Sequence, residues 1–499
     1  MQQSEFDLNY ADSELVLGLV APVGTDLDQV STWIAERLSQ FSYASPRIRL
    51  SDFAAKLEGD LPEPKDEFAR VGQLMTASNE MRRAADRSDV LALYAANAVH
   101  QARGDGAEKK PRPRTAHVLR SLKRPEEVAT LRRIYGAGFF LVAVSSTRDE
   151  RLAYLMNDKG MTREQASELL HRDEAEEDDD FGQRTRETFH LGDVFVSQKE
   201  DVWRFLDLVF GEPYITPTRE EYAMFLAFAA SVRSGDLSRQ VGAVVVSESG
   251  EVIATGANDV PAPGGGTYWP DAHDQRDAKL GFDPNEARRD ALVVDVTRRL
   301  IPGFEKKSNE DVLAEGKVRL RGSPLFDLTE FHRAVHAEME ALLACARSGI
   351  SVRGATMFTT TYPCHNCAKH IVGAGIKRVI FVEPYAKSLA EALHGDAIRG
   401  TEAPERAEST TPFVSFDPFV GVGARRFIDL FSMMLGAGDK RVRKQSGRTK
   451  PFDRKLASLR VPMMPNSYIE REAIAAALLE KVTESEGADG QEETDSKSS

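Results

Sequence analysis

Two short motifs constrain this chain more than any other feature: H-A-E at residues 336–338 and P-C-H-N-C at residues 363–367. One imidazole and two thiolates form a ligand set for a tetrahedral zinc ion that keeps its fourth position for water. Zinc lowers the pKa of that water towards neutrality, so a hydroxide is available at physiological pH. We therefore predict a Zn2+ centre whose ligands are His336, Cys364 and Cys367. Glu338 is not a ligand in this pattern, and we assign it the transfer of protons to and from the substrate.

The segments around the two motifs alternate between strand and helix patterns. Residues 355–361 and 377–383 are rich in β-branched and aromatic residues and predict strands. The residues that follow H-A-E predict a helix, and a second helix is predicted to begin at Pro363. Cys364 and Cys367 are three residues apart and would share one face of that helix. The alternatives are a structural zinc knuckle or a reduced cysteine pair. A structural zinc site is closed by a fourth ligand, and the 3 cysteines of the chain provide no second pair.

Length and charge limit the classes of function. A chain of 499 residues is long enough for at least two domains, each with its own core. Its formal net charge of −13 argues against a generic polynucleotide-binding protein, because neutralising phosphates requires a basic surface. No disulfide framework is expected, so the predicted location is the reducing cytoplasm. The sequence has no signal-peptide pattern and no apolar run of membrane-spanning length.

Residues 1–212 predict an α/β domain with a largely parallel sheet. A buried strand over 14–21 leads through a glycine-containing turn to a helix over 27–41, which is the geometry of a phosphate-binding loop. The candidate nucleotide-binding residues are Gly18, Gly24 and Thr25. Five residues rather than four separate the two glycines, and a threonine stands where the phosphate-gripping lysine belongs, so phosphoryl transfer is not expected. An ordinary strand–helix turn is the alternative.

The rest of this domain continues the alternation of strands and helices. Further strands are predicted at 48–53, 118–122 and 139–145. A helix is predicted over 125–135, with a solvent face formed by Glu126, Glu127, Arg132 and Arg133. The acidic run at 173–180 is interpreted as a solvated loop rather than a metal site. A Gly- and Pro-containing segment at 211–217 marks the domain boundary.

Residues 213–435 are predicted to form the metal-binding domain. A helix over 219–234 is followed by a β-hairpin with strands at 240–247 and 252–258. Residues 261–330 form an insertion, which at this length is either a functional lid or a disordered excursion. Two histidines in or beside it are interpreted as surface or structural residues rather than metal ligands: His273 and His332.

The composition changes after residue 435. Residues 436–483 form a C-terminal extension with a basic arm at 440–455. The arm is the one region suited to polynucleotide, but a solvated linkage or a subunit contact is the favoured interpretation. An amphipathic helix is predicted over 469–482. Residues 484–499 are predicted to be a disordered acidic tail.

Over roughly residues 220–390 the sequence resembles deoxycytidylate deaminases. The matching segments are SRQVGAVVV (238–246), ATGAND (254–259), HAEMEA (336–341), TTTYPCHNCAKHI (359–371) and AGIKRVIFVEPY (374–385). The resemblance implies a cytidine-deaminase-like α/β/α domain with the zinc ligands and the proton carrier assigned above. It also implies that Asn258 binds the sugar hydroxyl and that the backbone of Ala337 meets the pyrimidine O2. The family's extra cysteines are missing here, so a second, structural zinc is not expected.

The whole chain is similar to bacterial antiphage deoxycytidylate deaminases, in which a degenerate P-loop NTPase- or kinase-like three-layer domain precedes the deaminase. The segments at 121–142 and 184–196 carry this wider resemblance. It implies deamination of dCTP and dCMP, depletion of dCTP during phage infection and, in some systems, inhibition by a small RNA. The expected partners are deoxycytidine nucleotides, a nucleotide effector at the N-terminal domain, an inhibitory small RNA and further copies of the chain.

Three functions remain open at this point. The first is an enzyme acting on free deoxycytidine nucleotides, for which Arg239 is a candidate phosphate-binding residue, with a structural salt bridge as its alternative role. The second is an editor of RNA or single-stranded DNA, which would need a basic groove with stacking aromatic residues. The third is a non-catalytic module whose working part is the N-terminal domain, and the intact Glu338 argues against it.

Overall fold

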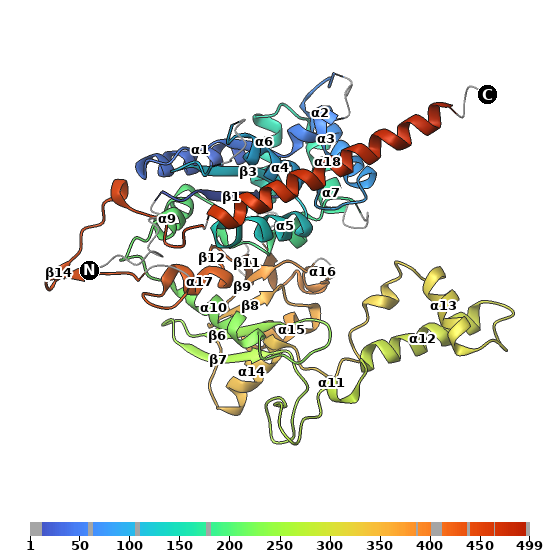
Figure 1. Cartoon of the computed structure of the whole chain (residues 1–499). Helices are drawn as coiled ribbons and strands as arrows, with labels where there is room; N and C mark the ends of the chain where they lie inside the picture. Colours follow the sequence, from blue (N-terminus) through green and yellow to red (C-terminus); the bar gives the residue numbers. More distant parts are fainter. Residues whose placement is uncertain are drawn as a thin grey trace. The chain divides into compact units, whose positions relative to one another are not determined.

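The computed structural model describes residues 12–57, 63–104, 110–175, 181–385, 388–400, 412–436, 440–463 and 465–495 (Figure 1). The chain forms two compact units. The first unit contains the residues up to Glu221 together with those from Phe419 onwards, and the second unit is Tyr222–Pro418. The sequence-based boundary lay at 212–213, and the segment after Phe419 was assigned to the metal-binding domain or to an extension. The structure differs, because this segment completes the first unit.

The first unit is built around one sheet with the strand order β12-β5-β4-β1-β3-β2. Its strands are β1 (Leu15–Val20), β2 (Arg47–Arg49), β3 (Ala116–Leu122), β4 (Phe139–Val144), β5 (Val194–Val196) and β12 (Gly421–Val422). The first five are parallel, and β12 pairs antiparallel with β5. Every residue of β1 and of β4 is buried, as expected for a parallel sheet that is covered on both faces. The predicted parallel-rich α/β architecture is confirmed.

Eleven helices of the first unit lie in the part of the chain that the structure describes. They are α1 (Leu27–Gln40), α2 (Ser51–Leu57), α3 (Glu67–Ala84), α4 (Val90–Gln101), α5 (Pro125–Tyr135), α6 (Arg148–Asn157), α7 (Arg163–Ala175), α8 (Thr185–Phe189), α9 (Lys199–Val209), α17 (Ala424–Phe431) and α18 (Pro465–Asp495). The strand predicted over 48–53 is wrong after Arg49, because Ser51 begins α2. The helix α18 runs to Asp495, where a disordered tail was predicted, because a helix that has begun is extended at low cost by residues such as the four glutamates of 484–495. Residues 496–499 lie outside the described residues.

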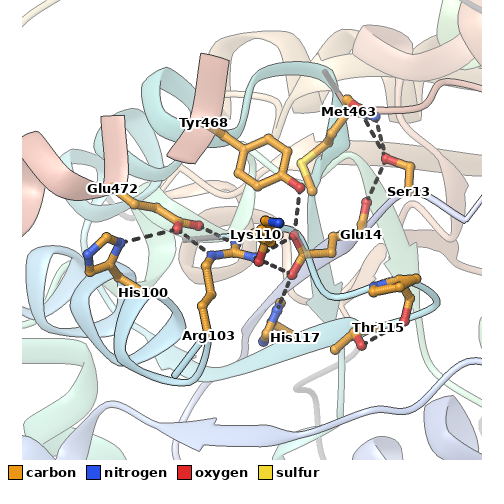
Figure 2. A network of polar contacts seen from close by, with 11 residues as sticks. Ser13, Glu14, His100, Arg103, Lys110, Thr115, His117, Met463, Tyr468 and Glu472 are labelled. Carbon is orange, nitrogen blue, oxygen red and sulfur yellow. Dashed lines mark hydrogen bonds and ion pairs between the residues drawn. The ribbon is translucent and has the colours of Figure 1, made fainter. Parts of the chain in front are cut away.

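A buried polar network ties α18 to the amino end of β1 (Figure 2). The Arg103 guanidinium donates to Glu14 at 2.6 and 2.8 Å and to Glu472 at 2.8 and 2.9 Å. The hydroxyl of Tyr468 donates to Glu14 at 2.6 Å. The side chains of Arg103, Glu14 and Glu472 are at most 1% exposed. These contacts explain why the C-terminal segment belongs to the first unit.

The second unit has a mixed sheet with the strand order β10-β11-β9-β8-β6-β7. Its strands are β6 (Gly242–Val246), β7 (Val252–Ala257), β8 (Thr356–Thr361), β9 (Arg378–Glu383), β10 (Ile398–Gly400) and β11 (Val414–Pro418). The strands β6 and β7 form the predicted antiparallel hairpin, β6 also pairs antiparallel with β8, and β8, β9, β11 and β10 are parallel. The helices are α10 (Arg219–Ser231), α11 (Asp277–Leu280), α12 (Pro284–Leu300), α13 (Asn309–Arg319), α14 (Ala337–Arg347), α15 (His365–Ala374) and α16 (Ala390–His394).

A glycine positions α14 on this sheet. A Cβ atom at Gly256 of β7 would lie 2.1 Å from the carbonyl oxygen of Ala337 and 2.5 Å from the amide nitrogen of Ala341. No side chain fits at that distance, so the strand must carry glycine for the first turns of α14 to pack against it. This close approach fixes the start of the helix that carries the H-A-E motif.

The insertion is an ordered helical segment in the part of the chain that the structure describes. Its helices α12 and α13 lie side by side (Figure 1). Where the insertion begins and ends, the backbones of Asp259 and Val335 pair. The amide nitrogen of Val335 lies 2.9 Å from the carbonyl oxygen of Asp259, and the amide nitrogen of Asp259 lies 3.2 Å from the carbonyl oxygen of Val335. The insertion therefore leaves and rejoins the second unit directly beside Asn258 and His336. No helix in the described residues combines the length and the apolar character needed to cross a membrane.

Candidate metal centre

Two helix N-termini carry the predicted zinc ligands. His336 is the N-cap residue of α14, and Cys364 is the N-cap residue of α15. Cys367 lies in the first turn of α15. The partial positive charge at a helix N-terminus favours thiolate over thiol, which supports the ionised form of Cys364, whereas the hydrogen bond with Cys364 and burial raise the pKa of Cys367.

The three side chains meet at distances that suit a zinc ion. The Nδ1 atom of His336 lies 3.4 Å from Sγ of Cys364 and 3.4 Å from Sγ of Cys367. The three potential ligand atoms all lie within 4.8 Å of one another. With Zn–N near 2.0 Å and Zn–S near 2.3 Å, a tetrahedral ion separates its N and S ligands by roughly 3.5 Å. The residues present therefore fit zinc.

The electrostatics of this group follow from burial and from mutual hydrogen bonds. The hydrogen bond from Cys367 and the neighbouring His336 lower the pKa of Cys364 to about 3. The Cys364 thiolate in turn raises the pKa of His336 to about 9. Burial raises the pKa of Glu338, whose Oε2 lies 3.5 Å from Sγ of Cys367 and whose side chain is almost completely enclosed. Glu338 is therefore a carboxyl group beside the metal ligands that accepts a proton more readily than an exposed glutamate does.

A cavity of about 230 Å³ opens onto these residues. His336, Glu338 and Cys364 line it, and so do the three predicted substrate-binding residues: Asn258, Ala337 and Arg239. The structure thus brings all of these side chains to one cavity of the second unit.

Asn258 is engaged with the backbone of the loop that precedes β6. Its Nδ2 donates to the carbonyl oxygen of Arg239 at 2.8 Å, and its Oδ1 accepts from the amide of Val241 at 2.7 Å. The Asn258 side chain therefore holds the loop in place at the cavity wall. Each atom retains one further hydrogen-bonding position for a ligand.

Arg239 forms an ion pair with Glu383 at the end of β9. The other oxygen of Glu383 accepts from the hydroxyl of Thr361 at 3.2 Å. The Arg239 side chain is 48% exposed, so this pair lies at the mouth of the cavity rather than in its interior. The sequence predicts the cation but not its carboxylate partner, although Glu383 is the last residue of the strand predicted at 377–383.

The insertion, for which a functional lid was one of the two predicted roles, also contributes to the cavity. Thr329 and His332, near its C-terminal end, and Tyr385, after β9, belong to the lining. His332 lines the cavity, and the metal-binding group among the described residues is His336, Cys364 and Cys367. The position of His332, four residues before His336 at the junction of the insertion with α14, is the sequence signal that places it in the cavity lining.

The residues predicted to bind a nucleotide in the N-terminal domain lie in the first unit. Gly18 is inside β1, where a Cβ atom would meet Leu122 at 2.5 Å and Phe139 at 2.9 Å, so it serves the packing of the sheet. Gly24, with φ of +88°, and Thr25 lie in the loop between β1 and α1 and line a second cavity. Gly18 is therefore not part of that loop.

Comparison with known proteins places the second unit in a family. The model of the cytidine and deoxycytidylate deaminase zinc-binding region matches residues 217–383. The deoxycytidylate deaminase of Enterobacteria phage T2 is 31% identical over 173 residues, which cover 33% of this chain and 79% of the phage protein. ComE operon protein 2 of Bacillus subtilis is 45% identical over 64 residues, which cover 12% of this chain and 34% of that protein. A crystal structure of the dCMP deaminase from cyanophage S-TIM5 covers 41% of this chain and 100% of its own, at 20% identity and a TM-score of 0.22.

The family match and the metal-binding group identify the class of the protein as a zinc-dependent deaminase, a hydrolase. The chain belongs to the deoxycytidylate deaminase family.

Proposed function

We propose that this protein deaminates free deoxycytidine nucleotides, with dCMP as a substrate and dCTP as a second one. One observation carries the proposal. A single cavity is lined by His336 and Cys364 of the metal-binding group, by the buried carboxyl group of Glu338 and by the cation of Arg239. The relatives named deoxycytidylate deaminases support the choice of dCMP. The choice of dCTP follows only from the wider sequence resemblance.

The chemistry is a hydrolysis at C4 of the cytosine ring. When bound, zinc supplies the Lewis acidity that makes hydroxide available at neutral pH. Glu338 takes a proton from the attacking water and delivers it to ring N3. It then takes the remaining proton of the hydroxyl group now on C4 and gives it to the amino group as the C4–N bond breaks, so that the products are the uracil nucleotide and ammonia. The backbone of Ala337 would receive the pyrimidine O2.

The sugar and phosphate would be recognised at the mouth of the cavity. The side chain of Asn258 is hydrogen-bonded to the backbones of Arg239 and Val241. One donor and one acceptor position of its amide group remain for the sugar hydroxyl. Arg239 would exchange Glu383 for the phosphate of the nucleotide, since both partners of the present pair are accessible to solvent. A pocket shaped for deoxyribose crowds a 2′-hydroxyl, so ribonucleotides would react more slowly.

Editing of RNA or single-stranded DNA is the weaker alternative. The basic arm at 440–455 is the sequence feature that supports this alternative. Several side chains of the arm are hydrogen-bonded or ion-paired within the first unit. Arg441 and Arg443 donate to the carbonyl oxygens of Glu212 and Pro213 at 2.7 Å, and Arg454 pairs with Asp207 at 3.3 Å. These contacts explain the arm as a structural element. The antiphage role, the cytoplasmic location, inhibition by a small RNA and homo-oligomerisation stay predictions from the sequence.

The test is release of ammonia by the purified, zinc-loaded full chain. We would compare dCMP, dCTP, CMP, deoxycytidine and a cytosine-containing oligonucleotide at equal cytosine concentration. The proposal expects the deoxyribonucleotides to react fastest, and Glu338→Gln serves as the matched inactive control. Faster deamination of the oligonucleotide than of either mononucleotide would overturn it in favour of the editor.

A further inference from the structure

A second cavity of about 230 Å³ lies in the first unit, at the carboxyl ends of β1 and β3. The loop 21–25, which follows β1, forms part of its wall, and Arg120 and Lys123 come from β3 and the residue after it. From β1 the chain passes first to β2 and β3 on one side and then to β4 and β5 on the other. Ligands of open parallel sheets bind at the carboxyl ends of the strands beside such a reversal.

The lining of this cavity has more cations than carboxylates. It includes Asp28, Glu67 and six cations: Arg49, Arg70, Arg82, Arg120, Lys123 and Lys159. Four of the cations are paired with carboxylates, Arg70 with Glu67, Arg120 with Asp28, Arg82 with Glu127 and Lys123 with Asp173, which leaves the charges of Arg49 and Lys159 in excess. Because a cavity with low-dielectric walls concentrates the field of its charges, this excess favours an anionic ligand.

Two of these guanidinium groups are deeply buried and incompletely bonded. Arg120 is 8% exposed and Arg82 is 1% exposed. The Nε–H group of each has no hydrogen-bond partner among the described residues. A buried donor without an acceptor is costly, so donors that line a cavity indicate a ligand rich in acceptor oxygens.

The loop after β1 does not hold an external anion in the manner of a phosphate-binding loop. The amide of Val23 donates to Oδ2 of Asp173 at 2.8 Å, and Oδ1 of the same carboxylate accepts from Lys123 at 3.0 Å and from Thr185 at 3.2 Å. The carboxylate of Asp26 accepts from two amides at the start of α1, at 3.0 Å each. These main-chain donors are thus bound to carboxylates of the chain itself. Asp173 is buried, so the interpretation of the acidic run as solvated is wrong at this residue, and residues 176–180 lie outside the described residues.

We propose that this cavity binds a small phosphate-bearing anion through side-chain cations, chiefly Arg49, Arg120 and Lys159. Asp28 now pairs with Arg120 and lies 3.7 Å from Arg49, and its side chain is 51% exposed. The phosphate would take the place of this carboxylate between the two guanidinium groups, since a dianion that accepts two forked donors outcompetes a monoanion. The Lys159 ammonium lies 5.2 Å from the centroid of the Tyr154 ring and would add a third positive charge.

The test is isothermal titration of the zinc-loaded full chain with two probes, inorganic pyrophosphate and dAMP. Both should bind, and the tighter one identifies the ligand as an inorganic anion or a nucleotide. Arg49→Ala should weaken binding at least about tenfold, the loss of one charge-assisted contact. Asp28→Asn should strengthen it severalfold by removing the competing carboxylate.

Arg47→Ala is the matched control, because Arg47 lies two residues away on the same strand, is exposed and is not part of the lining. The Arg47→Ala variant should bind pyrophosphate and dAMP with affinities within about twofold of the wild-type values. Arg239→Ala should leave both affinities equally unchanged, which separates this cavity from the deaminase cavity. Absence of binding by both probes at millimolar concentration, or equal losses in Arg49→Ala and Arg47→Ala, would overturn the proposal. Since the readout is binding, failure here leaves the proposed deaminase function untouched.

Discussion

Replacement of Arg103 by methionine would measure how strongly the buried network at the amino end of β1 stabilises the first unit (Figure 2). Methionine keeps the apolar stem of arginine but removes the hydrogen bonds that Arg103 donates to Glu14 and Glu472. Both carboxylates are inaccessible to solvent, so water cannot replace the lost guanidinium without opening the structure. Removing one partner of a buried ion pair costs about 3–5 kcal/mol. We expect the free energy of unfolding of the first unit to fall by about that amount at pH 7.

Urea-induced unfolding followed by tryptophan fluorescence is the assay, because Trp33 and Trp203 both lie in the first unit. The matched control is Arg83→Met, which removes an ion pair to Glu80 whose two side chains are 45% and 50% exposed. Exposed pairs contribute about 0–1 kcal/mol, so this control should stay close to the wild type. A loss below about 1 kcal/mol for Arg103→Met would refute the reasoning.

The same variant makes a prediction about pH. Burial opposes the charge of Glu14, yet the hydrogen bond with His117 and the charge of Arg103 bring the pKa of Glu14 below its ordinary value. Burial raises the pKa of Glu472 despite its bonds to Arg103. Without the guanidinium, the pKa of each carboxyl group should lie above its unfolded value of about 4.3. A group with a raised pKa stabilises the fold at low pH and loses that contribution as the pH rises. The stability gap between wild type and variant should therefore widen between about pH 5 and pH 8, and a gap that is constant or narrows would contradict this account.

Three further predictions concern the deaminase cavity. Cys364→Ser or Cys367→Ser should lose the metal together with activity, whereas Cys345→Ala should retain both; metal analysis after dialysis checks this, and zinc retained by either serine variant would exclude that ligand. Glu338→Gln should keep the zinc but lower kcat by about 10²–10⁴-fold, and turnover near the wild-type rate would remove Glu338 from the proton-transfer role. Arg239→Ala should raise KM about tenfold for dCMP and leave KM for deoxycytidine nearly unchanged; equal effects on both substrates would assign Arg239 a structural role.

The metal centre could be predicted from the sequence because its ligands lie in two local motifs. The spacing of Cys364 and Cys367 defines one helix turn, and the strand pattern at 355–361 places that helix at the end of β8. His336 needed one long-range assumption, that the start of α14 meets the start of α15. The residue types alone supported it, since one imidazole and two thiolates have few other uses at this spacing.

Buried ion pairs escaped the same analysis. Glu127 was predicted on the solvent face of the helix over 125–135, but its carboxylate is buried, caps α5 and pairs with the fully buried Arg82 at 2.9 Å. Asp173 was assigned to a solvated loop and instead lies against the loop after β1. Hydrophobic periodicity sorts charged residues to the surface by default, because an unpaired charge is costly to bury. A cation partner offsets the cost of burying the carboxylate. That partner is Arg82 for Glu127, 45 residues away, and Lys123 for Asp173, 50 residues away, so neither pair is visible in the local pattern.

The cations proposed to bind phosphate share one feature in both units. Arg239 is paired with Glu383, and Arg120 is paired with Asp28. Such a carboxylate keeps the guanidinium in position when no ligand is bound. A ligand that replaces the carboxylate must interact with the guanidinium more strongly than the carboxylate does. A dianionic phosphate does so because it carries more charge than the carboxylate it replaces, whereas a nucleoside without phosphate leaves the pair intact. The selectivity expected of Arg239→Ala therefore arises from an exchange between two anions, and Glu383→Gln should lower KM for dCMP while leaving KM for deoxycytidine unchanged. Higher KM for dCMP in that variant would show that Glu383 orients Arg239 instead of competing for it.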